Sequence, residues 1–244
     1  MLSKSKIKYI QTLGQKKFRE EEGVFIAEGP KIVTELLAEK KANIIAVYAL
    51  EEWVADHTKL VGSTEIITIT AIELEKISQL KTPNKVVAIV QQFSTDENVL
   101  AKDKITLALD DIQDPGNLGT IIRIADWFGV QQIVCSNNSA DMYNSKVVQS
   151  TMGSIARVKI VYTDLEQWLQ QQEGIRIYAT ALEGTDIGTM EKINEGIIVF
   201  GNESKGISPE IFAACTDKIT IPKKGKAESL NAGVAAGIVV AQLV

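Results

Sequence analysis

The sequence predicts an α/β protein in which a small N-terminal α/β domain precedes a larger domain built on a parallel sheet. The chain has 244 residues, of which 45% are hydrophobic and 23% are charged, and these ordinary globular values leave enough interior for two cores. In its second half, short apolar runs alternate with stretches of helical periodicity. That alternation is typical of parallel strands covered by helices.

The N-terminal part is predicted to mix both kinds of element. One helix is expected from about Ser5 to Glu20, a second is opened by Gly29-Pro30 and runs toward Lys40, and a third covers Ala71 to Leu80 with apolar residues at helical spacing. Apolar and β-branched runs predict the strands Val24 to Ala27, Ile44 to Ala49, Glu65 to Ile69 and Val86 to Gln91.

A polar segment between Ser94 and Asp103 is the best candidate linker in the chain. It separates an N-terminal domain, residues 1–95, from a C-terminal domain, residues 105–244, with the linker itself at 96–104. The second domain is expected to contain the strands Ile105–Leu109, Gln132–Cys135, Val158–Val161, Ile175–Ala179, Gly196–Phe200 and Lys218–Ile221.

Composition narrows the possible functions. His57, the only histidine, is expected in a surface loop, and Cys135 and Cys215 stand alone and are expected to be core thiols, so neither a metal site nor a disulfide framework is expected. No secretory signal is evident, and Val234 to Val244 is too short to span a bilayer and is expected to be a buried helix. These patterns predict a cytoplasmic protein with no membrane contact.

Net charge is −5, which argues against indiscriminate phosphate binding. Two basic runs stand out locally, each of which is also compatible with an ordinary solvated face. They are the N-terminal cations Lys4, Lys6, Lys8, Lys16, Lys17 and Arg19, and the segment Pro222-Lys223-Lys224-Gly225-Lys226.

Three segments follow strands and are candidates for a site. The first, Asp110 to Arg123, is a turn-rich loop at the carboxyl end of a strand, where ligands of open α/β sheets bind. A tight turn and a packed helix would explain its glycines but not Arg123. Pairing with Asp126, one turn later on the helix, is the structural alternative for Arg123.

The second segment is the loop Gly201 to Gly206, whose two glycines could form a phosphate nest but match neither a P-loop nor a dinucleotide fingerprint. The third runs from Ile219 through the basic segment to a polar Ser-Leu-Asn sequence at the start of the final helix. Glu228 or Ser229 is the expected N-cap of that helix.

In their order and spacing, these three segments resemble the three motifs of the SpoU (TrmH-like) branch of the SPOUT RNA methyltransferases, from about Ile105 to the C-terminus. Phe25 to Lys31 and Thr82 to Val90 are similar to the small N-terminal substrate-binding domain of that family. This second resemblance implies an α/β module related to ribosomal-protein folds that binds RNA.

The resemblance implies methyl transfer from S-adenosylmethionine to a ribose 2′-hydroxyl in structured RNA, with ribosomal RNA preferred over transfer RNA. It also implies a C-terminal trefoil knot, which fold rules alone make improbable, and a homodimer whose site forms at the subunit interface. By position it implies a catalytic region of Asn117, Arg123, Glu203, Ser229 and Asn231, and cofactor contacts at Gly201, Gly206, Ile221, Leu230 and Thr180. Ser204 departs from the glycine that many relatives have.

Two roles are open for Arg123. It is the proposed base in the family, but a guanidinium with a pKa above about 12 is a poor proton acceptor. The more conservative hypothesis is that it stabilises developing alkoxide charge or holds a phosphate. Two other classes of function compete: a non-catalytic RNA-binding protein, and a Rossmann enzyme, which lacks the expected glycine fingerprint.

Overall fold

The computed structural model describes residues 1–62, 64–94 and 99–244, so the start of the predicted linker, up to residue 98, lies outside the described residues. The described chain divides into two compact units. The first contains Met1–Ser94 and Tyr143–Ala156, and the rest of the described chain forms the second.

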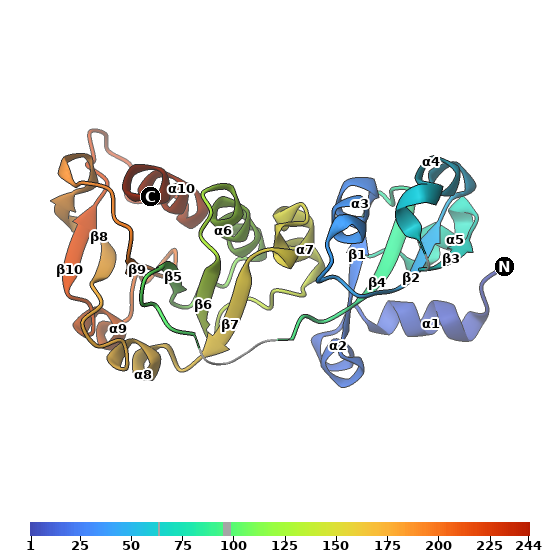
Figure 1. The fold of residues 1–244 in the computed structure, drawn as a ribbon, viewed down its shortest axis with the longest axis horizontal. Coiled ribbons are helices and arrows are strands. Elements are labelled where there is room, and N and C mark those ends of the chain that lie inside the picture. Colours follow the sequence, from blue (N-terminus) through green and yellow to red (C-terminus); the bar gives the residue numbers. More distant parts are fainter. Residues whose placement is uncertain (63, 95–98) are drawn as a thin grey trace. The chain divides into compact units, whose positions relative to one another are not determined.

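The first unit is a four-stranded sheet with helices packed on it (Figure 1). Its strand order is β1-β4-β2-β3, in which β4 is antiparallel to both of its neighbours and β2 is parallel to β3. The elements are α1 Lys4–Thr12, α2 Lys16–Glu22, β1 Val24–Glu28, α3 Pro30–Ala38, β2 Ile44–Ala49, α4 Glu51–Val61, β3 Glu65–Thr68, α5 Ala71–Ile77, β4 Val86–Gln91, α7 Ser145–Thr151 and η1 Ser154–Ala156.

The prediction of a single helix from Ser5 to Glu20 is wrong, because the structure breaks it into α1 and α2. Gly14 lies in the break, where a residue of low helix propensity lowers the cost of leaving the helix. The guanidinium of Arg19 donates to the carbonyls of Leu13 and Gly14, at 3.0 and 2.9 Å. Arg19, predicted as part of a basic run, is instead buried and satisfies the carbonyls at the break.

A second correction concerns His57, which lies on helix α4 and not in a loop. Its ring stacks on Trp53, with 4.3 Å between ring centroids, and Nδ1 lies 2.8 Å from the Trp53 carbonyl oxygen. The polar residues around His57 predicted a loop because they form the exposed face of an amphipathic helix. The polar pattern therefore placed this segment at the surface correctly but predicted the wrong secondary structure.

Helix α5 begins with a capping box. The Thr70 hydroxyl accepts the Glu73 N–H, and the Glu73 carboxylate accepts the Thr70 N–H at 3.0 Å. The same carboxylate accepts the N–H of Leu2 at 2.5 Å, which ties the N-terminal residues to α5. The hydrogen bonds from Thr70 and then Leu2 favour the ionised form and lower the pKa of Glu73 from 4.5 to about 2.

We expect the stability contribution of Glu73 to vanish in acid. A carboxyl whose folded pKa lies below its unfolded value stabilises the protein above the unfolded pKa, and loses that effect as the pH falls toward the folded pKa. At neutral pH, Glu73→Gln should therefore unfold at a lower urea concentration than the wild-type protein. The difference between the two unfolding midpoints should disappear as the pH falls from 4.5 to about 2. Urea unfolding of both proteins across this range measures it. A gap that stays constant would contradict the assignment.

The segment Tyr143–Ala156 groups with the first unit although it connects two strands of the second unit. The Tyr143 hydroxyl accepts the Phe93 N–H at 2.9 Å, and the Gln149 amide donates to the Glu28 carbonyl at 2.9 Å. These contacts lie far apart in sequence, so a boundary drawn from composition could not reveal them.

The second unit is a six-stranded sheet in which every neighbouring pair is parallel, as the alternating pattern predicted (Figure 1). The strand order is β10-β8-β9-β5-β6-β7. The elements are β5 Ile105–Leu109, α6 Pro115–Trp127, β6 Gln132–Ser136, β7 Lys159–Thr163, α8 Leu165–Gln170, β8 Ile177–Asp186, η2 Ile187–Thr189, β9 Gly196–Phe200, α9 Pro209–Ala213, β10 Asp217–Thr220 and α10 Ala232–Leu243.

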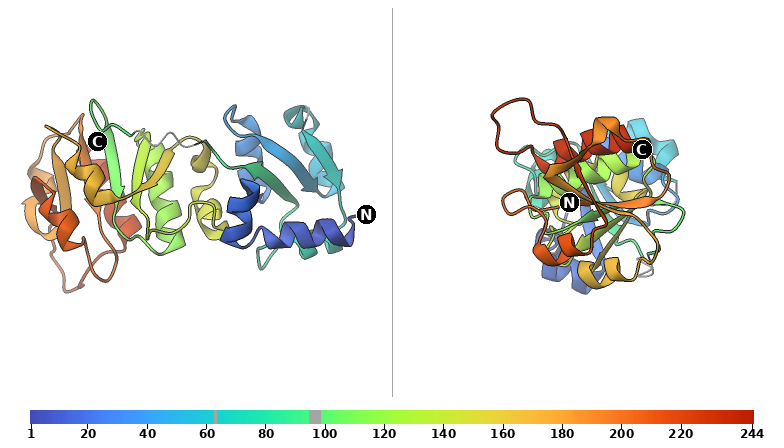
Figure 2. Two further views of the ribbon diagram at one scale, coloured as in Figure 1. Left: turned by 90° about the horizontal axis from the view of Figure 1, so that it is seen from below. Right: turned by 90° about the vertical axis from the view of Figure 1, so that its left-hand side faces the viewer.

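Helices cover both faces of this sheet, with α6 against α10 on one side and α8 near α9 on the other (Figures 1 and 2). The central strands β5 and β9 are mostly apolar, and β9 is buried along its whole length. All strands of a parallel sheet end at one edge, so the loops after β5, β9 and β10 are brought to the same edge. Within the described residues, no helix is long and apolar enough to cross a bilayer.

Candidate functional site

The first predicted site residue, Asn117, lies in the first turn of α6. Asp114 is the N-cap of this helix, and its carboxylate accepts the Asn117 N–H at 2.8 Å. Pro115 at the first helical position suits the start of a helix because its missing N–H would have no partner there. The Asp-Pro pair therefore holds Asn117 at the loop edge of the sheet, where only 7% of it is exposed.

The Asn117 side chain joins the three predicted motifs. Its Nδ2 donates to Glu203 Oε1 at 2.6 Å, and its Oδ1 accepts from Asn231 Nδ2 at 2.7 Å. A carboxylate can only accept, so the Glu203 contact determines which way the amide points. The partners are 86 and 114 residues away in sequence.

Asn231 continues this chain of hydrogen bonds into α10. Its Oδ1 accepts the Val234 N–H at 3.2 Å, which makes Asn231 the N-cap of the helix. The prediction of Glu228 or Ser229 as the N-cap is wrong by two or more residues. Ser and Asn are both favoured N-cap residues, and Asn231 is the one whose side chain also contacts Asn117.

A second set of contacts holds the loop after β9. Asn202 Nδ2 donates to the Asp111 carbonyl at 2.9 Å, and its Oδ1 accepts the N–H groups of Ser204 and Lys205. Asp110, 6% exposed, accepts the Ser208 N–H at 2.7 Å. Sequence reasoning named neither Asn202 nor Asp110 as a site residue, although Asp110 follows directly on one predicted strand and Asn202 lies two residues after the end of another.

Arg123 lies on the exposed face of α6, six residues after Asn117 and so about 9 Å further along the helix. It forms no hydrogen bond or ion pair with another described residue of this chain. The predicted alternative, pairing with Asp126, is not what the structure shows, because Asp126 pairs with Arg157 at 2.9 Å. Ser229 is likewise exposed and without a hydrogen-bond partner in the described chain.

The five predicted cofactor residues divide into two groups. Thr180 and Gly206 use their polar groups within the fold: the Thr180 hydroxyl donates to the Val199 carbonyl at 2.7 Å, and Gly206 exchanges two backbone hydrogen bonds with Asn202. The backbone N–H groups of Gly201, Ile221 and Leu230 have no acceptor among the residues that the structure describes.

Gly201 is required by close packing of the chain. A Cβ at this position would lie 2.3 Å from both the Gly206 carbonyl carbon and the Ile207 nitrogen, so any side chain would push the loop open. The glycine at 201 thus explains the tight turn, and the suggested phosphate nest is instead closed by the bridge between Asn202 and Gly206.

S-adenosylmethionine fits the donor set at this edge of the sheet. Unused backbone N–H groups suit the polar edge of an adenine or the cofactor's carboxylate, and exposed leucines suit its apolar surface. Leu230 is 47% exposed, and Leu182, in the bulge where the register of β8 against β10 shifts, is 75% exposed. Across the described residues, no cluster of three metal-binding side chains occurs.

Two family profiles match separate parts of the chain. The profile of the SpoU rRNA Methylase family matches residues 104–241, and that of the MRM3-like substrate binding domain matches residues 4–88. A Bacillus subtilis (strain 168) protein named 23S rRNA (guanosine(2553)-2′-O)-methyltransferase RlmP is 29% identical over 98% of this chain and 95% of its own length.

Two solved structures are similar over nearly the whole chain. A TrmH-family protein from Porphyromonas gingivalis, described as a putative RNA methyltransferase, has a TM-score of 0.87 and 33% identity, covering 99% of this chain and 98% of its own. An AdoMet-bound rRNA methyltransferase from Sinorhizobium meliloti has a TM-score of 0.82 and 30% identity, covering 99% and 95%.

Proposed function

Because this chain belongs to the SpoU rRNA methylase family and is an RNA 2′-O-methyltransferase that uses S-adenosylmethionine, we propose that its substrate is a ribose 2′-hydroxyl in 23S ribosomal RNA. The observation that carries the assignment of the site is Asn117, whose one side chain hydrogen-bonds both Glu203 and Asn231. Three loops that are distant in sequence thereby form one polar surface.

We assign the cofactor-binding role to the loops containing Gly201, Ile221 and Leu230, whose backbone donors are unused. Thr180 and Gly206 act indirectly, by holding β8 to β9 and closing the loop after β9. When bound, S-adenosylmethionine supplies an electrophilic methyl group on a sulfonium. The residues of this chain then have to align the ribose oxygen with that methyl group and exclude competing geometries.

Glu203 is proposed to orient the ribose. Its Oε1 is occupied by Asn117, whereas its Oε2 has no partner among the described residues and can accept a hydrogen bond from the substrate. Arg123 is proposed to stabilise the negative charge that develops on the ribose oxygen as its proton leaves to water. A guanidinium serves this role well because it stays protonated. Ser229 and Asn231 are proposed to add neutral hydrogen-bonding groups to the site.

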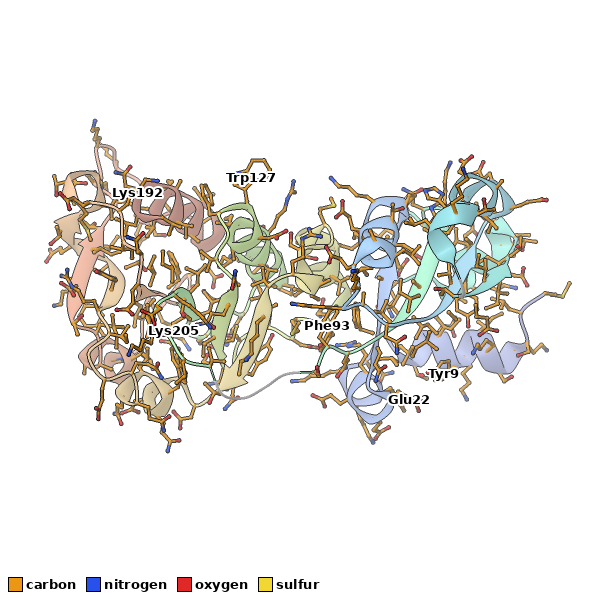
Figure 3. The ribbon with its side chains drawn as sticks, viewed as in Figure 1. Tyr9, Glu22, Phe93, Trp127, Lys192 and Lys205 are labelled. Atoms are coloured by element: carbon orange, nitrogen blue, oxygen red, sulfur yellow. The ribbon has the colours of Figure 1, made fainter. Side chains whose placement is uncertain are left out.

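A homodimer is part of the proposal, with α6 and α10 as the contact surface. A Cβ on Gly233 would lie 3.0 Å from Thr120 Cγ2, so the glycine lets these two helices pack closely. Three apolar side chains on these helices are exposed to solvent, namely Trp127 at 81%, Val234 at 51% and Ile238 at 40%. Trp127 points away from its unit (Figure 3). Exposed apolar side chains on two helices that pack together favour a contact surface there. Arg123 lies on the same exposed side of α6, so dimer formation through this surface would place Arg123 next to the second subunit.

Trp127→Ala should weaken this dimer by roughly 30-fold, the effect of losing about 2 kcal/mol at a contact centred on a large aromatic side chain. Sedimentation equilibrium measures the change in dissociation constant. Leu100→Ala is the matched control, because Leu100 is 68% exposed but lies on neither helix. Equal effects of the two substitutions would place the subunit contact elsewhere.

The division of labour and the knot are also proposals. Residues 1–95 would bind RNA and residues 105–244 would catalyse, with residues 96–104 as the linker, and the protein would work in the cytoplasm. The path of the chain supports a trefoil knot. Strand β10 lies at one edge of the sheet, yet the helix that follows it, α10, packs on α6, the helix that follows the central strand β5.

The deciding experiment maps 2′-O-methylation in total RNA from cells with and without the gene. Loss of one methylated ribose in 23S ribosomal RNA, restored by the wild-type gene, is expected. Loss of a methylated ribose in a transfer RNA instead would identify transfer RNA as the substrate. No change in RNA, together with no binding of S-adenosylmethionine to the purified protein, would favour the non-catalytic RNA-binding alternative.

A further inference from the structure

The segment between β10 and α10 has no visible packing role. We name Pro222–Lys226 the lysine loop. All of residues 222–231 are exposed, and no hydrogen bond holds residues 222–230 to the rest of the described chain. A Cβ on Gly225 would meet no atom within 4 Å. The segment stands out from its unit (Figure 2), so packing explains none of its side chains.

Its charge is also uncompensated. Lys223, Lys224 and Lys226 form no ion pair with a described carboxylate, in a protein whose net charge is −5. The N-terminal basic run behaves differently. There, Lys16 pairs with Glu20 and Lys17 with Glu21 at i,i+4 spacing. The positive potential predicted for the N-terminus is therefore partly neutralised, whereas that of the lysine loop is not.

The loop is tied to the proposed catalytic site. It leads into Asn231, which is hydrogen-bonded to Asn117 at 2.7 Å. Lys226 is five residues before Asn231, so its backbone lies within about 18 Å of that contact even for an extended chain. Lys205 adds another exposed cation two residues after Glu203, on the neighbouring loop. Uncompensated lysines thus border the surface where the ribose is proposed to bind.

We propose that Lys223, Lys224 and Lys226 bind backbone phosphates of the substrate RNA beside the target ribose, so that the catalytic unit has an RNA-docking surface of its own. This rests on the proposed function. Three lysines within four positions span at most about 10 Å, which suits a short run of phosphates and not a whole groove. Phosphate contacts position a nucleic acid without reading its sequence, and each releases counterions.

The test uses the full-length protein and an unmodified 23S ribosomal RNA transcript. K223Q/K224Q is compared with K102Q/K104Q, which removes the same charge from exposed lysines that precede β5, at the opposite edge of the sheet. We expect the slope of log affinity against log salt to fall by about 1.5 for K223Q/K224Q, and by much less for the control. KM for RNA should rise with a smaller change in kcat, because phosphate binding acts on ground state and transition state alike.

Equal salt slopes for the two variants would overturn the proposal. Dissociation of the K223Q/K224Q dimer into monomers would also overturn it, because the loop would then be a subunit contact. Failure of the proposed function is a separate result. In that case the wild-type protein itself does not methylate the transcript, whereas failure of the lysine loop leaves wild-type methylation intact.

Discussion

Arg123→Ala should lower the rate of ribose methylation by roughly 100- to 1,000-fold, the usual effect of removing one positioned donor that stabilises developing negative charge. Binding of S-adenosylmethionine and the unfolding temperature should stay as in the wild type. The side chain is exposed and without a partner in the described chain, so its removal leaves no buried group unsatisfied. Single-turnover methylation and calorimetric cofactor binding measure the two effects.

The controls for Arg123 separate charge from geometry. Arg123→Lys keeps the charge but loses the planar fork of donors, and should recover only part of the rate. Arg176→Ala removes an exposed arginine that pairs with Asp217 on another part of the sheet, and should leave methylation unchanged. If Arg123→Ala methylates RNA at the wild-type rate, both proposed roles of this residue are wrong.

Asn117→Asp should both inactivate and destabilise the protein. The replacement cannot donate to Glu203, and it places a second carboxylate where an amide nitrogen now lies 2.6 Å from Glu203 Oε1. With only 7% of Asn117 exposed, water screens this repulsion poorly. The expected loss of unfolding free energy is about 3 kcal/mol, typical of an uncompensated charge at a buried polar contact. Urea unfolding and methylation assays measure the two losses.

A second substitution tests the reason for that loss. Glu203→Gln in the Asn117→Asp protein supplies an amide that can donate to the new carboxylate, so stability should return while activity does not, because Glu203 is itself assigned to the ribose. Asn138→Asp makes the same chemical change at an exposed position and should be close to neutral. If the double variant is as unstable as Asn117→Asp alone, like-charge repulsion is not the cause.

Local sequence patterns were sufficient for much of this protein. Apolar runs identified every strand of the parallel sheet, and the polar loops that follow β5, β9 and β10 were recognised together as the motifs of one family. These signals are local, because side-chain alternation, turn residues and helix spacing involve neighbours within about four positions. The same local patterns missed contacts beyond this range.

Arg19 lies six and five positions after Leu13 and Gly14, whose carbonyls its buried guanidinium binds at the break between α1 and α2. The grouping of Tyr143–Ala156 with the first unit depends likewise on Phe93 and Glu28. No periodicity reports contacts of this kind.

The sequence alone predicted the strands of the parallel sheet, the three loops proposed to carry the chemistry and the family that the chain resembles. Only the tertiary structure decided the strand order, the capping of α10 by Asn231 and the central place of Asn117. The physical reason is separation: Asn117 meets partners 86 and 114 residues away, and such contacts exist only once the whole sheet has packed.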